Sequence, residues 1–143
     1  MGIIITSAKE EDAIWIKQLY KDEKEHIGDF NLFYVWVNYI GGTGTSKFIV
    51  IGKKAFMRYR WSVQANSYII DEMAVGSLFK KEGLGKHLVQ SMMKKAAREN
   101  KKLTVKCNAT NDAANQFYER CGLQFEGEYY TKNRGTKQFV WTT

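Results

Sequence analysis

The most informative stretch of the sequence is Lys80-Lys81-Glu82-Gly83-Leu84-Gly85-Lys86, which is preceded by Asp71-Glu72-Met73-Ala74-Val75. Residues 68–75 are predicted to form a strand, entered through the turn formers at 65–67. Apolar residues then recur every four positions from Leu84 to Ala96, which predicts an amphipathic helix. A strand that leads through glycines into a helix exposes backbone N–H groups at the positive end of the helix dipole. The stretch therefore predicts an anion-binding turn, to which Lys80, Lys81 and Lys86 add positive charge. Taken alone, Gly-x-Gly also fits a tight strand-to-helix turn.

Toward the C-terminus the pattern alternates between strands and one more helix. Leu103, Val105 and Cys107 alternate with polar residues, as in a strand with two different faces. A helix is predicted from Asp112 to Cys121, capped by Asn111 and stopped by Gly122. Two further strands are expected at 123–130 and 138–142, around a turn at 132–135.

Toward the N-terminus the predicted order is strand, helix and hairpin. Ile3-Ile4-Ile5 is β-branched and suits a buried strand, and Ser7-x-x-Glu10 offers a capping box for a helix from Asp12 to Lys24. The aromatic segment from Phe30 to Ile40 fits either a helix face or an extended wall. The Gly/Thr/Ser tract at 41–46 is expected to be a loop, and strands at 47–51 and 55–61 then form a hairpin.

This order of elements predicts a single α/β (α+β) domain over residues 1–143. With 143 residues and 44% apolar types, the chain is long enough for one compact core. A mixed sheet with helices on its faces is the layer arrangement that fits the alternation.

Two signatures resemble the GCN5-related N-acetyltransferase (GNAT) family. Lys80-x-x-Gly83-x-Gly85 is similar to its pyrophosphate motif Arg/Gln-x-x-Gly-x-Gly/Ala, with Lys80 as the departure. The segment from Asn111 to Leu123 looks like its second motif, Asn-x-x-Ala-x-x-x-Tyr-Glu-x-x-Gly-Phe, with Leu123 in place of Phe. The two motifs occur in the family's order, and the resemblance is good from about Tyr68 to Phe125.

The resemblance implies a twisted mixed sheet of about six or seven strands, flanked by about four helices and split between the strands at 68–75 and 103–108. It also implies that acetyl-coenzyme A (acetyl-CoA) binds, its pantetheine arm pairing with the backbone near Met73 and Val75. The cofactor-binding residues that it implies are Met73, Ala74, Val75, Lys80, Lys81, Glu82, Gly83, Leu84, Gly85, Lys86, Asn111 and Tyr118.

Acetyl transfer to an amine by direct attack in a ternary complex needs a neutral amine, a stabilised oxyanion and a proton for the departing thiolate. By resemblance Tyr118 supplies that proton, although its position also fits a packing residue on a buried helix face. Glu72 is favoured as the general base. Period-2 alternation puts Asp71 on the opposite face, and a bulge would exchange the two carboxylates, so Asp71 is an alternative base. An ordered water is another alternative. Glu72 also fits a carboxylate satisfied by solvent or by a neighbouring lysine.

The acceptor is an amine of a small molecule or a polypeptide. Members that acetylate protein N-termini often carry an acidic residue where this chain has Lys106, which argues against such a substrate. Acceptor recognition in the family implicates the stretches 30–39 and 129–134, whose aromatics also suit core packing. A homodimer is a further expectation from the family.

Charge and cysteine content leave two rival functions open. The formal net charge of +7, from 22 Lys+Arg against 15 Asp+Glu, favours anionic partners, although most basic residues suit a solvated surface. One rival is a non-catalytic acyl-CoA-binding module, and the other is a basic nucleic-acid-binding domain, for which no recognition motif appears. Cys107 and Cys121 are expected to be reduced structural residues, no metal site is predicted, and the absence of a leader or membrane-like run leads us to expect a cytoplasmic protein.

Overall fold

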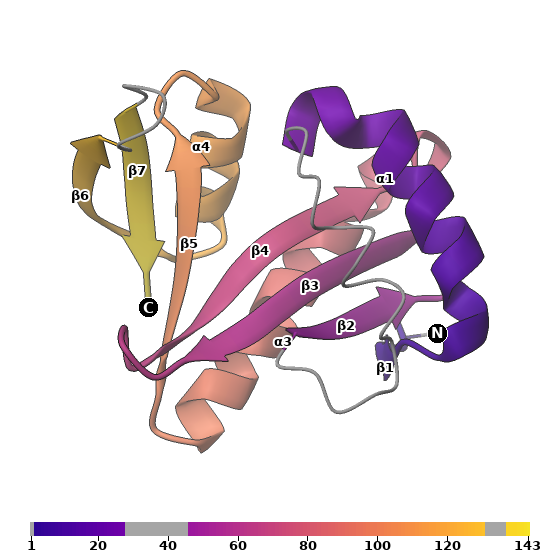
Figure 1. The fold of residues 1–143 in the computed structure, drawn as a ribbon, viewed down its shortest axis with the longest axis horizontal. Helices are drawn as coiled ribbons and strands as arrows, with labels where there is room; N and C mark the ends of the chain where they lie inside the picture. Colours follow the sequence, from indigo (N-terminus) through magenta and orange to yellow (C-terminus); the bar gives the residue numbers. More distant parts are fainter. Residues whose placement is uncertain (1, 28–45, 131–136) are drawn as a thin grey trace. The chain divides into compact units, whose positions relative to one another are not determined.

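The computed structural model describes residues 2–27, 46–130 and 137–143, and among these residues it contains a mixed sheet of seven strands (Figure 1). The strand order is β1-β2-β3-β4-β5-β7-β6. β4 and β5 are parallel, whereas the pairs β1–β2, β2–β3, β5–β7 and β6–β7 are antiparallel. The strands are β1 (Thr6–Ser7), β2 (Ser46–Ile51), β3 (Ala55–Ser62), β4 (Ser67–Val75), β5 (Lys102–Asn108), β6 (Gln124–Tyr130) and β7 (Lys137–Thr142).

Helices connect the strands where the sequence periodicity predicts them. The α-helices are α1 (Ala13–Ile27), α3 (Leu84–Arg98) and α4 (Asp112–Arg120), and the 3-10 helices are η1 (Glu10–Asp12) and η2 (Ser77–Glu82). The expected fold class, a mixed sheet flanked by helices, is confirmed. No helix in the described part of the chain is long and apolar enough to span a membrane.

The chain forms two compact units, to which β4 and α3 both contribute. Unit 1 comprises Met1–Trp61 and Asp71–Leu88, and unit 2 comprises Ser62–Ile70 and Val89–Thr143. The expected single domain over 1–143 stays a prediction.

The core of unit 1 lies between α1 and the strands beside it. Ile16 and Tyr20 are one helical turn apart on α1, and both are fully buried against apolar side chains of β2, β3 and β4. Burial of such a side chain stabilises a fold by about 1.5–3 kcal/mol. This shared core fixes α1 against the strands that lead into the glycine-containing turn. The strand residues of the cluster are Phe48, Val50, Phe56 and Ala74.

The N-terminal predictions were wrong in detail. Ile3 and Ile4 are exposed and precede β1, because the residues that pair with β2 are Thr6 and Ser7. The expected capping box at Ser7 and Glu10 is replaced by one between Lys9 at the N-cap and Asp12 three residues later. The backbone N–H of Lys9 donates to Asp12 Oδ2 at 2.8 Å. Asp12 Oδ1 also accepts from Trp15 Nε1 at 2.7 Å, so Asp12 serves the first turn of the helix twice. The helix consequently starts later than expected and extends to Ile27.

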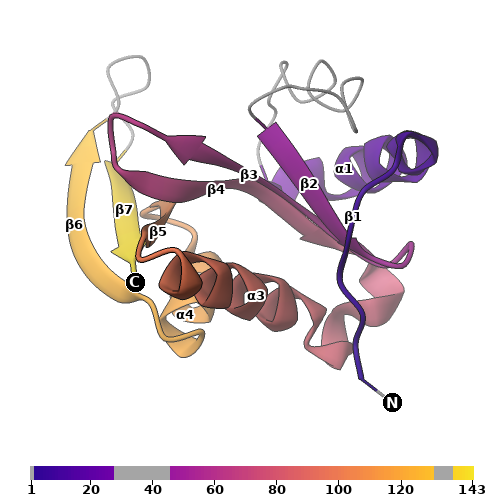
Figure 2. The same ribbon diagram turned by 90° about the horizontal axis from the view of Figure 1, so that it is seen from below.

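Unit 2 confirms the C-terminal predictions closely. Leu103, Val105 and Cys107 are buried on β5, whereas Lys106 and Asn108 are exposed. Ser67–Ile70 of β4 pair with Lys102–Val105, and β6 and β7 lie side by side in both views (Figures 1 and 2). A register shift between Phe125 and Gly127 interrupts the β6–β7 pairing. The aromatic segment at 30–40, the tract at 41–45 and the turn at 132–135 lie outside the described residues.

Candidate active site

The glycine-containing turn of unit 1 connects β4 to α3 through η2. Gly83 ends η2 with φ 74° and ψ 22°, a left-handed conformation that side chains with a Cβ adopt at a cost. An added Cβ at Gly83 would meet nothing within 4 Å, so the conformation, and not crowding, requires glycine. α3 begins at Leu84, and the first backbone amides of an α-helix have no acceptor within the helix. The predicted turn into a helix is therefore present, with Leu84, Gly85 and Lys86 in the first helical turn. Anion binding by this turn stays a prediction.

Two of the charged residues in this turn are held by partners in unit 1. Lys80 Nζ lies 2.9 Å from Glu23 Oε2, and Glu23 is 8% exposed on α1. Glu82 Oε1 lies 3.5 Å from Lys54 Nζ. Lys81 and Lys86 are exposed, and no ion-pair partner for either occurs in the described part of the chain. The positive charge available to an anion is thus that of Lys81 and Lys86.

The second half of β4 presents its side chains alternately. Glu72 and Ala74 are buried, whereas Asp71, Met73 and Val75 are half-buried, so burial alternates along this part of the strand. The carboxylates of Asp71 and Glu72 nevertheless both contact the guanidinium of Arg58. The backbone near Met73 and Val75 is expected to pair with the pantetheine arm of the cofactor, and this stays a prediction. The expected split of the sheet between β4 and β5 beyond residue 70 also stays a prediction.

Glu72 forms a bidentate ion pair with Arg58, a residue that the sequence reasoning missed. Arg58 is 2% exposed on β3; its Nη2 donates to Glu72 Oε1 at 2.8 Å, and its Nε donates to Oε2. The same guanidinium donates to Ser46 Oγ at 2.8 Å and lies 3.3 Å from Asp71 Oδ2, which also accepts from Arg60 at 3.0 Å. Burial raises the pKa of Glu72, and the contact with Arg58 opposes that rise.

A signal for this network exists in the sequence. Arg58 and Arg60 alternate along one strand, and the acidic pair Asp71-Glu72 lies on the next, so a hairpin places two cations opposite two carboxylates. The result is a buried Glu72 carboxylate whose orientation is fixed by Arg58.

Asn111 and Tyr118 belong to unit 2 and to the same helix. Asn111 is the N-cap of α4, and its Oδ1 accepts from the backbone N–H of Ala114 at 3.1 Å, which confirms its capping role. Tyr118 is 8% exposed, and no hydrogen-bond partner for its hydroxyl occurs among residues 2–27, 46–130 and 137–143. Burial, followed by the neighbouring thiols of Cys107 and Cys121, raises the pKa of the phenol. The phenol therefore stays protonated at neutral pH, as a proton donor must.

Cys107 and Cys121 are both buried, and neither forms a disulfide. Burial raises the pKa of Cys107 to about 12, which suppresses its thiolate. Both thiols are thus packing groups beside Tyr118.

The comparisons with known proteins give the family. The model of the FR47-like protein family matches residues 51–131, and no curated protein matches the chain. Among solved structures, one from Desulfovibrio desulfuricans described as an acetyltransferase of the GNAT family has a TM-score of 0.80 at 16% identity, over 99% of this chain and 98% of that one.

Two further structures of the same fold have named acceptors. The ribosomal-protein-S18-alanine N-acetyltransferase from Escherichia coli has a TM-score of 0.72 at 17% identity, covering 99% of this chain and 92% of that one. A variant of the spermidine N-acetyltransferase from Vibrio cholerae has a TM-score of 0.74 at 12% identity, with the same coverage. These likenesses agree with the family match, which covers more than half of the chain. The chain belongs to the FR47-like family of GNAT-type acetyltransferases.

Proposed function

We propose that this chain is an N-acetyltransferase that moves the acetyl group of acetyl-CoA to a primary amine by direct attack in a ternary complex. The observation that carries the proposal is the turn at Gly83, where the first amides of a fifteen-residue helix follow a left-handed glycine. Beside it lie Lys81 and Lys86, which have no ion-pair partner among the described residues. That arrangement suits a diphosphate, and acetyl-CoA contains one.

The turn contains backbone and side-chain donors that suit the diphosphate of this cofactor. The backbone amides of Leu84, Gly85 and Lys86 would hold the diphosphate, and the ammonium groups of Lys81 and Lys86 would neutralise it. Lys80, which stands at the motif's first position, is committed to Glu23 instead. When bound, acetyl-CoA supplies an acetyl group activated as a thioester.

Tyr118 is proposed to protonate the departing thiolate. Its high pKa keeps the phenol neutral, so the proton must pass as the carbon–sulfur bond breaks. The hydroxyl has no competing hydrogen bond among the described residues, which leaves it available to a bound group.

Glu72 is proposed to remove the amine proton through an ordered water. A carboxylate has about four lone-pair sites, and the two donors from Arg58 leave room for a water. Direct action by Glu72 or by Asp71 is less compatible with their guanidinium partners. Arg58 orients this carboxylate and is therefore a positioning residue for the proposed base.

The acceptor is proposed to be an amine of a small molecule or a polypeptide. The names of two structural neighbours span this range, from a ribosomal-protein alanine to spermidine. Lys106 is exposed on β5, where it gives an approaching peptide N-terminus a like charge. This observation favours acceptors other than protein N-termini. A cytoplasmic location and a homodimer stay predictions.

The test has a binding arm and a turnover arm. At a concentration one hundred times its Kd, acetyl-CoA is expected to stabilise the fold by about 2.7 kcal/mol and to raise the thermal midpoint by roughly 5–10 °C. Release of free thiol is then measured over a panel of amines. An unchanged midpoint at millimolar acetyl-CoA contradicts the proposal, whereas a raised midpoint with no thiol release for any amine favours a non-catalytic acyl-CoA-binding module.

A further inference from the structure

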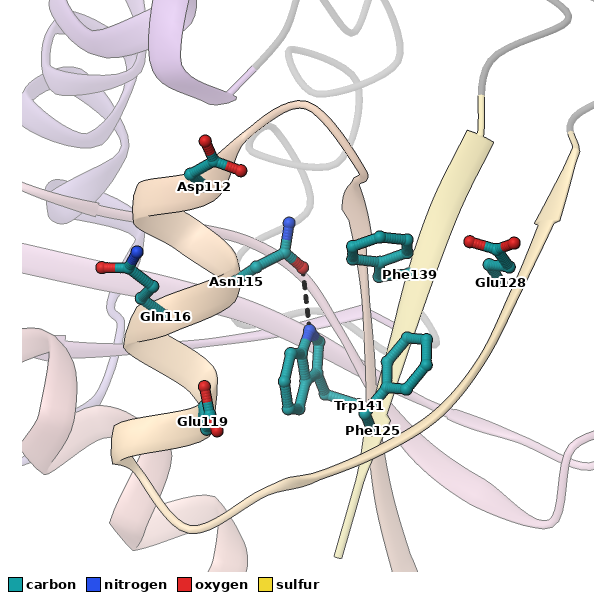
Figure 3. Close-up of a pocket in the computed structure, with 8 residues that line it drawn as sticks. All are labelled: Asp112, Asn115, Gln116, Glu119, Phe125, Glu128, Phe139 and Trp141. Carbon is teal, nitrogen blue, oxygen red and sulfur yellow. Dashed lines mark hydrogen bonds between the residues drawn. The ribbon is translucent and has the colours of Figure 1, made fainter.

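Unit 2 contains a pocket of about 350 Å³ that no step of the proposed function uses (Figure 3). It opens between α4 and the β6–β7 pair. The described residues that line it are Asp112, Asn115, Gln116, Glu119, Phe125, Glu128, Phe139 and Trp141.

Three aromatic rings form one wall of the pocket. Phe125 makes edge contacts with Phe139 and Trp141, at centroid distances of 5.1 and 5.6 Å. Figure 3 shows these rings gathered across from α4. Phe125 is 51% exposed, so a large part of this aromatic surface faces solvent.

The rings are held in place by a satisfied polar network. Trp141 Nε1 donates to Asn115 Oδ1 at 2.8 Å, and Asn115 Nδ2 donates to the carbonyls of Asn108 and Asn111 at 3.1 and 2.9 Å. Both the oxygen and the nitrogen of the Asn115 side-chain amide are therefore hydrogen-bonded. The pocket is preformed, because its deepest polar atoms already have their partners.

The charge around the rings is negative, although the chain carries a net +7. Three carboxylates and no Lys or Arg belong to the described lining. Glu128 pairs with Lys137 at 2.9 Å, whereas Asp112 and Glu119 have no ion-pair partner in the described part of the chain. Arg120 Nη2 donates to Gln116 Oε1 at 3.4 Å, and Arg120 itself is not part of the lining. This local sign selects against the anions that the rest of the surface attracts.

We propose that this pocket binds a small organic ammonium ion. Aromatic faces attract ammonium groups, more strongly where water is excluded, and the free carboxylates of Asp112 and Glu119 complement the charge. With about 30 Å³ for each water-sized group, the volume admits on the order of ten non-hydrogen atoms. The site is distinct in chemistry from the turn at Gly83, which favours anions, and the inference does not rest on acetyl transfer.

The test compares a charged probe with its neutral isostere. Choline and 3,3-dimethyl-1-butanol have nearly the same shape but differ in charge, and choline has no N–H to acetylate. Each is titrated into the ¹⁵N-labelled protein while the indole N–H signal of Trp141, identified with Trp141→Phe, is followed. Choline is expected to shift this signal to saturation, with an affinity at least about fivefold above that of the alcohol.

Two exposed positions supply the variants. Glu119→Gln and Phe125→Leu are expected to weaken choline binding by about two- to fivefold each. Glu126→Gln is the matched control: it removes the same charge from an exposed carboxylate of β6 outside the pocket, and is expected to leave choline affinity unchanged. The proposal is overturned if choline and the neutral alcohol shift the signal equally, or if choline leaves the indole N–H signal of Trp141 unchanged. It is also overturned if Glu126→Gln weakens choline binding as much as Glu119→Gln does.

Discussion

The hydroxyl of Tyr118 combines burial with the lack of a hydrogen-bond partner among the described residues. A buried hydroxyl without a partner costs about 1–3 kcal/mol, so a fold that keeps one needs a reason outside stability. Proton donation to a departing thiolate is such a reason. The family motif and the structural cost therefore point to the same atom.

Tyr118→Phe should separate these two effects. Turnover is expected to fall by about 10²–10⁴-fold, because the proton donor is lost, while the affinity for acetyl-CoA changes little. The free energy of unfolding should stay equal or rise by about 1 kcal/mol, since the variant removes a polar group without a partner. Thiol-release kinetics and urea unfolding measure the two quantities. Unchanged turnover would assign proton donation elsewhere or favour the non-catalytic module.

Glu99 shows how neighbouring donors set a carboxyl pKa in unit 2. Tyr68 Oη donates to Glu99 Oε1 at 2.6 Å, and Lys95 and Lys101 lie at 3.0 and 3.3 Å. The Tyr68 hydrogen bond, followed by that of Lys95, lowers the pKa of Glu99 to about 2. Because the folded pKa lies below the unfolded value of 4.5, the contribution to stability is present above pH 4.5 and is lost as the pH falls toward 2.

The expected result concerns the stability gap between the natural chain and Glu99→Gln. Urea unfolding at a series of pH values from about 5 to about 2 should show this gap narrowing toward acid, as the linkage relation requires. Glu126→Gln, which removes an exposed carboxylate paired only at 3.9 Å, should show a much smaller pH dependence. A gap that stays constant or widens toward acid would contradict the assignment.

Among the secondary-structure elements, the turn from β4 to α3 contains two adjacent lysines, Lys80 and Lys81, whose surroundings differ. Lys80 joins the turn to α1 through Glu23, whereas Lys81 is exposed and free of ion pairs within the described residues. Lys80→Gln is expected to lower the free energy of unfolding by about 1–2 kcal/mol, between the values for exposed and buried pairs. Lys81→Gln should leave stability within about 0.5 kcal/mol and weaken acetyl-CoA binding by about two- to fivefold.

The pair of variants serves as its own control, because each removes one positive charge from the same turn. Thermal unfolding and calorimetric titration with acetyl-CoA give both quantities for both proteins. Lys80→Gln could instead weaken acetyl-CoA binding more than Lys81→Gln does, without loss of stability. Lys80 would then contact the cofactor, as the motif's first position implies, and its ion pair with Glu23 would contribute little to stability.

The elements that local pattern predicts well are those whose burial follows a period. The stripe Leu84, Leu88, Met92 and Ala96 is buried throughout, and Asn111 and Gly122 begin and end α4 as expected. The prediction of a buried strand at Ile3–Ile5 was wrong, because pairing with β2, and not β-branching, determines which residues form β1. The partner of Glu72 was also missed: Arg58 lies 14 positions away, and only the register between two strands brings them together. Sequence motifs thus located the turn and Tyr118, but not the ion pairs that orient their neighbours.

At the scale of the whole molecule, the fold is kept at low identity. The solved structure with a TM-score of 0.80 shares 16% of its residues with this chain. Such divergence is compatible with one fold because burial pattern and turn chemistry tolerate many substitutions of similar volume. Acceptor choice can therefore differ between proteins that share this fold.

The net charge of +7 allows a test between the family assignment and its nucleic-acid rival. Binding of a fluorescent duplex oligonucleotide should weaken steeply between about 50 and 200 mM salt, because each neutralised phosphate releases counterions. Acetyl-CoA binding, which involves few phosphates and a fixed set of backbone amides, should lose less than about tenfold over the same range. Fluorescence anisotropy with and without saturating acetyl-CoA measures both. Oligonucleotide binding that survives 200 mM salt and is unaffected by acetyl-CoA would make nucleic acid a specific partner. Its loss with salt would instead identify the basic surface as a general attractor of anions, as the net charge alone predicts.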